Sequence, residues 1–168
     1  MTEHSVIIAG GGPVGLIAGL GLARQGVPVT ILERHAELPD DPRAATTHPA
    51  TLELLGAYGM EEDVRKAGLV CPTFQHWDRV SGDLIAEFDH AVLAGETDYP
   101  YVVQCEQYKI SRIALDRLAD EPLATVRLGA ELTGFAQDAD GVDVTVQTAD
   151  GEDHLRTSWL VGADGGRS

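Results

Sequence analysis

Basic side chains are scarce in this sequence. Its 168 residues include 12 Lys and Arg against 27 Asp and Glu, which gives a formal net charge of −15. So acidic a chain repels polyphosphate backbones and anionic lipid surfaces, and we expect neither a nucleic-acid nor a membrane partner. Gly, Pro or charged residues interrupt every apolar run too early for a transmembrane helix. No secretory signal pattern opens the chain, so we expect a cytoplasmic protein.

Residues that bind metals or form disulfides are few or unsuitably spaced. The two cysteines, Cys71 and Cys105, form neither a CxxC motif nor a disulfide framework, which is typical of idle thiols in a reducing compartment. None of the six histidines has a histidine four positions away, so we expect no metal site. Because no serine lies in a GxSxG motif, we assign no nucleophile, and the catalytic residues stay unknown.

The first thirty-odd residues predict a strand, a helix and a second strand. Residues 5–9 and 29–32 are continuous apolar runs rich in β-branched side chains, as in strands buried on both faces. Residues 13–25 lie between them, with Pro13 suited to a first helical turn and Gly26 to a helix end. The apolar positions that predict the packed face of this helix are Val14, Ile17, Ala18, Gly21 and Leu22. A βαβ unit of this length requires parallel strands.

The remaining pattern predicts further helices, short strands and a meander. We expect helices at residues 50–58, 61–67 and 107–118, and strands at 73–78, 84–88, 124–128 and 159–161. Valines alternate with polar residues at 142–146, between two Asp-Gly turns, so residues 131–157 predict a three-stranded antiparallel meander. We expect the last strand to be buried, and Trp77 and Trp159 to lie in the core.

The parallel strands predict an α/β, Rossmann-like fold. Placed side by side in the order 124–128, 29–32, 5–9, 159–161, they give the half-Rossmann strand order 3-2-1-4. Glycine-rich segments follow the strands at 5–9 and 159–161, so two loops flank the crevice where such sheets bind ligands. We expect residues 1–168 to form one FAD-binding domain, with the βαβ unit at 5–33 and the meander at 131–157.

The first glycine-rich loop matches a dinucleotide-binding fingerprint. Residues 10–15 read GGGPVG, a GxGxxG motif that follows a strand and opens a helix. Gly10 permits the tight turn, Gly12 lets the backbone approach a pyrophosphate, and Gly15 allows close packing of helix and strand. Pro13 and Val14 complete the predicted cofactor-binding loop, where amide groups at the helix start face the anion. The structural alternative is a plain glycine turn.

Glu33 closes the second predicted strand. A carboxylate at this place accepts hydrogen bonds from the adenosine ribose hydroxyls in such folds. Its negative charge also opposes a 2′-phosphate in the same pocket. The alternative is a solvated acid at the end of a strand.

Four segments together resemble FAD-dependent aromatic hydroxylases. They are VIIAGGGPVGLIAGLGLARQGVPVTILER, DPRAATTHPATLELLGAYGM, VVQCEQYKISRIALDRLA and GADGGRS. This family comprises single-component flavin monooxygenases similar to p-hydroxybenzoate and 3-(3-hydroxyphenyl)propionate hydroxylases. The first segment is shared by many flavoproteins, whereas the four in this order are specific, and they cover essentially the whole chain.

The resemblance implies further FAD-binding residues. Arg43 matches the arginine that reaches the pyrophosphate and flavin end of FAD, and Gln104 matches the glutamine that bonds the ribityl region. Asp164 matches the acid of a second, Asp-Gly motif beside FAD at residues 162–168, which is also implicated in NAD(P)H use. Arg34 completes the family's usual Glu-Arg pair. The structural alternatives are a surface ion pair for Arg43, a helix-start cap for Gln104 and a plain turn for Asp164-Gly165.

The resemblance also implies an activity for the intact protein. Members use FAD, with NADH or NADPH as a transient co-substrate, to transfer oxygen from O2 to a small aromatic substrate. Neither a third FAD motif nor a substrate-covering domain is recognisable in these residues, so we expect the N-terminal part of such an enzyme, inactive alone. Substrate, nicotinamide preference and oligomeric state stay open, and a homo-oligomer is possible.

Three alternatives remain open at this stage. One is an NAD-dependent dehydrogenase module, which uses the same fingerprint. Another is a related flavoprotein with different chemistry, such as a halogenase, an epoxidase or a reductase. The third is a non-catalytic FAD-binding or interaction fragment.

Overall fold

The computed structural model describes residues 5–42 and 44–166, which divide into two compact units. The first unit comprises residues 1–41 and 110–168, and the second comprises residues 42–109. In the first unit the elements are β1 (Val6–Ala9), α1 (Pro13–Arg24), β2 (Val29–Glu33), β8 (Ala124–Leu128), β9 (Glu131–Gln137), β10 (Val142–Thr148), β11 (Gly151–Thr157) and β12 (Trp159–Gly162). Helix α4 (Gln107–Ala119) begins in the second unit and ends in the first.

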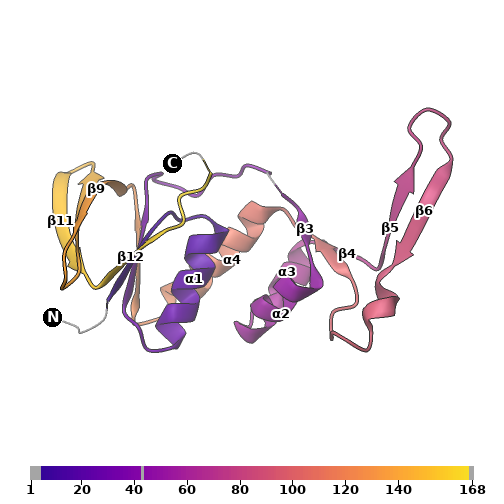
Figure 1. The fold of residues 1–168 in the computed structure, drawn as a ribbon, viewed down its shortest axis with the longest axis horizontal. Helices are drawn as coiled ribbons and strands as arrows, with labels where there is room; N and C mark the ends of the chain where they lie inside the picture. Colours follow the sequence, from indigo (N-terminus) through magenta and orange to yellow (C-terminus); the bar gives the residue numbers. More distant parts are fainter. Residues whose placement is uncertain (1–4, 43, 167–168) are drawn as a thin grey trace. The chain divides into compact units, whose positions relative to one another are not determined.

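A parallel sheet organises the first unit (Figure 1). Its strand order is β12-β1-β2-β8, which confirms the order predicted from the sequence and the Rossmann-like fold class. In register, Ile8 of β1 lies opposite Ile31 of β2 and Val161 of β12. Because the strands are parallel, β1, β2 and β12 all end at the same edge of the sheet.

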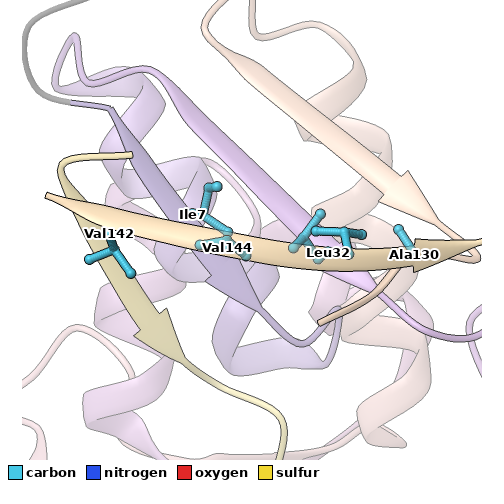
Figure 2. Packing of buried hydrophobic residues seen from close by; sticks show 6 residues of the cluster. Ile7, Leu32, Ala130, Val142 and Val144 are labelled. Carbon is cyan, nitrogen blue, oxygen red and sulfur yellow. The ribbon is translucent and has the colours of Figure 1, made fainter. Parts of the chain in front are cut away.

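Side chains of β1 and β2 alternate between two packed faces. Ile7 and Leu32 face the antiparallel meander of β9, β10 and β11, where they pack with Ala130, Val142 and Val144 (Figure 2). Every residue in this cluster is at most 7% exposed, so the meander covers one face of the sheet with a dry core. This confirms the three-stranded meander predicted from the alternating valines.

The other face of the sheet packs against α1. A Cβ on Gly19 would lie 3.0 Å from Cγ1 of Ile31 and 3.7 Å from Cδ1 of Ile8, so only glycine allows this close approach. The predicted helix is confirmed, but of the five positions predicted to pack only Gly21 is buried, and Val14 is 69% exposed. The buried residues are Gly15, Leu16, Gly19, Leu20, Gly21 and Ala23. Because nearly every position in α1 is apolar, glycine at positions 15 and 19 decides which face packs.

The last strand, β12, also differs from the prediction. It pairs with β1 at one end of the sheet order, and most of its residues are exposed rather than buried. Trp159 is 66% exposed, so its predicted place in the core is wrong. In the described part of the chain, β12 is an edge strand with an uncovered apolar surface.

The second unit contains helices and two small antiparallel sheets. Its elements are β3 (Thr46–Thr47), α2 (Pro49–Ala57), α3 (Glu61–Ala67), β4 (Leu69–Cys71), β5 (Thr73–Trp77), β6 (Leu84–Asp89), a 3-10 helix at His90–Leu93 and β7 (Val102–Gln104). One sheet has the order β3-β7-β4, and β5 and β6 form a hairpin that extends beyond β4 (Figure 1). The predicted helices and the hairpin strands are confirmed. Trp77, which we expected in the core, is 55% exposed on this hairpin.

Candidate functional site

Two glycine-rich loops meet at the carboxyl ends of β1 and β12. The Gly10 amide donates to the Leu32 carbonyl at 2.8 Å, and the Ala163 amide donates to the Ala9 carbonyl at 2.7 Å. Gly10 has a φ of +114°, and a Cβ on it would lie 2.8 Å from the Asp164 nitrogen and closer still to Ala163. Glycine is therefore required at position 10, both for the backbone conformation and for the contact between the loops.

The start of α1 leaves an open backbone surface beside these loops. Gly12 is the N-cap residue, with φ −72° and ψ 176°, and Pro13 is the first helical residue. The first intrahelical bond runs from the Leu16 amide to the Gly12 carbonyl at 3.0 Å, so the Val14 and Gly15 amides precede it. A Cβ on Gly12 would meet no atom of the described residues within 4 Å. The helix N-terminus with its adjacent space suits an anion such as a pyrophosphate.

Gly15 contributes to the same region through packing. A Cβ there would collide with the Gly10 carbonyl oxygen and lie 3.3 Å from Cγ2 of Ile8. The three fingerprint glycines therefore have different roles. Gly10 and Gly15 are needed by the fold itself, whereas the space at Gly12 is not used by any described residue.

Glu33 lies buried at the end of β2, next to the first loop. Its Oε2 accepts a hydrogen bond from the Gly11 amide at 2.7 Å, and its Oε1 accepts from the His35 amide at 2.9 Å. The His35 ring nitrogen Nδ1 lies 2.6 Å from the same Oε1. Burial raises the pKa of the Glu33 carboxyl, but the hydrogen bonds from His35 and Gly11 outweigh it and leave the pKa below its ordinary value. The side chain is therefore an anion at neutral pH.

Sequence reasoning missed two residues of this site, Gly11 and His35. A Cβ on Gly11 would lie 2.7 Å from the Glu33 Cβ, so glycine is needed here although the fingerprint leaves this position free. The signal available in the sequence was a third glycine between Gly10 and Gly12. No local pattern marked His35, because its role depends on the bond to Glu33.

The other predicted site residues are distributed over both units. Arg34 directly follows β2 and is exposed, and Asp164 is exposed in the second loop. Gln104 lies on β7 in the second unit, where its Oε1 accepts a hydrogen bond from the Thr46 hydroxyl at 3.0 Å. Arg43 lies outside the described residues.

The described part of the chain shows neither a metal-binding cluster nor a reactive thiol. No group of three His, Cys, Asp or Glu side chains there is placed to hold a metal ion. Both described cysteines are free, and burial raises the pKa of the Cys105 thiol, which makes it a poorer nucleophile. Within the same residues, no helix has the length and hydropathy needed to span a membrane.

The geometry fits the adenine-nucleotide half of a dinucleotide. Helix amides and an open glycine face suit a pyrophosphate, and an ionised carboxylate at the end of the next strand suits a ribose diol. The family model for FAD-binding domains matches residues 3–168. The chain belongs to this FAD-binding domain family.

Two relatives of this FAD-binding domain are monooxygenases. The para-nitrophenol 4-monooxygenase of Pseudomonas sp. (strain WBC-3) is 34% identical over 167 residues, which are 99% of this chain and 41% of that protein. The 6-hydroxy-3-succinoylpyridine 3-monooxygenase of Pseudomonas putida is 34% identical over 166 residues, 99% of this chain and 42% of that protein. The chain thus spans about two fifths of the length of these relatives.

Solved structures show the same fold. The p-nitrophenol 4-monooxygenase of Pseudomonas putida DLL-E4 superposes with a TM-score of 0.93 at 36% identity, over 98% of this chain and 42% of that one. An aklavinone-11 hydroxylase in a ternary complex with FAD and aklavinone superposes with a TM-score of 0.87 at 32% identity, over 100% of this chain and 34% of that one.

Proposed function

We propose that this FAD-binding domain holds the ADP part of FAD at the carboxyl ends of β1 and β2. Glu33 accepts a hydrogen bond from the adenosine ribose, and the amides of Val14 and Gly15 face the pyrophosphate. The backbone of Gly12 lies closest to the phosphate oxygens. The observation that carries this proposal is the open Gly12 face beside an ionised, buried Glu33 carboxylate.

The other predicted residues are proposed to contact FAD outside the pyrophosphate and ribose site. By resemblance, Asp164 in the second loop lies beside the cofactor, and Arg34 follows Glu33 at the edge of the ribose pocket. Arg43 and Gln104 are assigned to the flavin and ribityl portion. The exposed positions of Arg34 and Asp164 support these roles, because both side chains are accessible to a ligand.

For the whole protein we propose a flavin-dependent monooxygenase. It uses NADH or NADPH and O2 to hydroxylate a phenolic or other small aromatic substrate, as the names of its relatives suggest. The bound flavin would supply the redox chemistry, while this chain's residues orient its adenine end. We further propose a cytoplasmic protein with no nucleic-acid or membrane partner. The acidic composition supports the absence of polyanionic partners.

Substitution of Gly12 tests the proposed cofactor site directly. Its φ of −72° and ψ of 176° are accessible to any residue before proline, and no atom in the described part of the chain lies within 4 Å of the added Cβ. The Gly12→Val variant should therefore fold normally. Its side chain would occupy the pyrophosphate space, so we expect FAD affinity to fall by about a hundredfold or more.

Gly95→Val provides a matched control. A Cβ on Gly95 also meets no atom within 4 Å, and this glycine lies in the second unit outside both glycine-rich loops. Flavin fluorescence titration and thermal melting are measured for both variants of the intact protein. Both should melt like the wild type, and only Gly12→Val should lose FAD. Full FAD retention by Gly12→Val would show that the pyrophosphate assignment is wrong.

A further inference from the structure

The Glu33 carboxylate is almost fully occupied by protein donors. An ionised carboxylate offers about four lone-pair positions, two on each oxygen. Oε1 accepts from the His35 amide at 2.9 Å and contacts the His35 ring at 2.6 Å, and Oε2 accepts from the Gly11 amide at 2.7 Å. Since a carboxylate is only an acceptor, Nδ1 of His35 carries the proton in this contact. One acceptor position is then left, and it belongs to Oε2.

We propose that His35 is a positioning residue that limits the ribose contact of Glu33 to one hydroxyl. The ring occupies Oε1, so only Oε2 remains for the ribose diol of the adenine nucleotide. One hydroxyl, 2′ or 3′, binds the carboxylate, and the other makes no hydrogen bond to Glu33. This inference rests on the proposed ADP-binding function and specifies how the pocket recognises the sugar.

The surroundings of His35 favour such a role over simple packing. The His35 side chain is 49% exposed, whereas that of Glu33 is 11% exposed, so the ring contributes little to a core. The backbone beneath it is fixed by two bonds from the β8–β9 turn. The Gly129 amide donates to the His35 carbonyl at 2.9 Å, and the Ala130 amide donates to the Glu33 carbonyl at 2.8 Å. The backbone at the end of β2 is therefore held without the His35 ring. The main interaction of the ring is its contact with Oε1 of Glu33.

The affinities of deoxy-nucleotides, compared with that of ADP, show how many ribose hydroxyls the Glu33 carboxylate binds. The intact protein, freed of FAD, is titrated by calorimetry with ADP, 2′-deoxy-ADP and 3′-deoxy-ADP. In the wild type we expect one deoxy analogue to bind about tenfold more weakly than ADP, the scale for a hydrogen bond to a charged group. The other analogue should bind within about threefold of ADP, because its missing hydroxyl has no partner on Glu33.

Variants of His35 should change this pattern in a defined way. His35→Ala frees Oε1, so the second hydroxyl gains an acceptor and both deoxy analogues should bind about tenfold more weakly than ADP. His35→Asn places an amide donor near the position of Nδ1 and should keep the wild-type pattern. His154→Ala removes an exposed histidine on β11, outside the proposed site, and should also leave the pattern unchanged. A purely structural role of His35 would alter overall affinity but not the difference between the two analogues.

Two results would overturn the inference while leaving the proposed function intact. They are equal losses for both deoxy analogues in the wild type, and an unchanged pattern in His35→Ala with ADP still bound. The wild-type comparison needs no variant, so it tests the inference even if His35→Ala folds poorly. Failure of the wild-type chain to bind ADP would overturn both the inference and the proposed function.

Discussion

The main-chain amide of Gly11 donates a hydrogen bond to Oε2 of Glu33 at 2.7 Å, across 22 positions of sequence. This bond joins the loop after β1 to the end of β2, and both residues are buried. It also fixes the direction of the carboxylate before any ligand arrives. The glycine-rich loop and the acidic strand end therefore form one preorganised site rather than two separate motifs.

Replacement of Gly11 should damage this arrangement. In Gly11→Ala, the new Cβ would lie 2.7 Å from the Glu33 Cβ and 3.0 Å from its Oε2, so the Glu33 side chain must move. We expect a loss of about 1–3 kcal/mol in the free energy of unfolding, the usual cost of overpacking, together with weaker ADP binding. Chemical denaturation and calorimetry measure the two effects. A Gly11→Ala variant with wild-type stability and wild-type ADP affinity would contradict the model of a preorganised Glu33.

The charge of Glu33 should make stability depend on pH. Its folded-state pKa is lowered, so its contribution to stability is present above the unfolded-state pKa and is lost as pH falls through the folded value. The unfolded value is about 4.3, which places the loss below about pH 4. Glu33→Gln should be less stable than the wild type at neutral pH, by about 1–3 kcal/mol for the lost charge-assisted bonds.

The difference in the free energy of unfolding between the wild type and Glu33→Gln reports on Glu33 alone, because the other acids are the same in both proteins. Hydrogen bonds from backbone amides lower the pKa of the half-buried Asp78, and one from Arg156 lowers the pKa of the exposed Asp138. Both acids contribute equally to the wild type and to Glu33→Gln. Urea unfolding is measured from neutral pH down to about pH 3. We expect the stability gap to close toward the acidic end. A gap that stays constant across this range would mean that the ionised form of Glu33 is not stabilised by the fold.

The strand order was predictable because it depends on strong local signals. Three of its four strands are short apolar runs, two of which lead into glycine-rich segments, and the βαβ rule then leaves few arrangements. The packed face of α1 was not predictable from periodicity, since apolar residues surround the helix. Gly15 and Gly19 select that face through contacts with Gly10 and Ile31, and these contacts exist only in the folded unit.

Burial of β12 was mispredicted for a related reason. Its sequence is as apolar as that of β1, but in the described part of the chain it has a strand on one side alone. Strands β3, β4 and β7 are two or three residues long, too short for any period to show. Of the site, the fingerprint glycines and Glu33 carried recognisable patterns. His35 did not, because its contribution arises from the geometry at the end of β2.

Glu33 should also exclude a 2′-phosphate from this groove. The carboxylate lies where the ribose hydroxyls are expected, so a phosphate on the 2′ oxygen would face a like charge. ADP-ribose should therefore compete with FAD for the apoprotein at least about tenfold better than 2′-phospho-ADP-ribose. Glu33→Gln should narrow this difference, while the exposed-site variant Glu152→Gln on β11 should not. NADPH bound in the Gly10–Gly15 groove of a soaked crystal would refute the assignment.

The 168 residues expressed alone should bind FAD weakly and hydroxylate nothing. They span about two fifths of the length of their relatives, and they carry uncovered apolar surface on both units. On β12, Trp159 is 66% and Val161 40% exposed; on the β5–β6 hairpin, Trp77 is 55% and Ile85 67% exposed. Surfaces of this kind favour association, so we expect concentration-dependent oligomers in sedimentation experiments.

We expect weak binding because only part of the predicted FAD contacts lies in these residues. The proposed site would hold the ADP part, and by resemblance only Arg43 and Gln104 reach the flavin and ribityl portion. Each missing polar or stacking contact to the flavin is worth on the order of 1 kcal/mol. Several such losses lower the affinity by a few orders of magnitude.

Without a closed pocket around the flavin, water would enter the site, so NADH or NADPH oxidation should not lead to hydroxylation of a phenol. Fluorescence titration with FAD and an NAD(P)H oxidation assay with and without phenols test both statements. Tight stoichiometric FAD binding with product formation coupled to NAD(P)H use would show that these residues suffice for catalysis, contrary to the argument from their exposed strands.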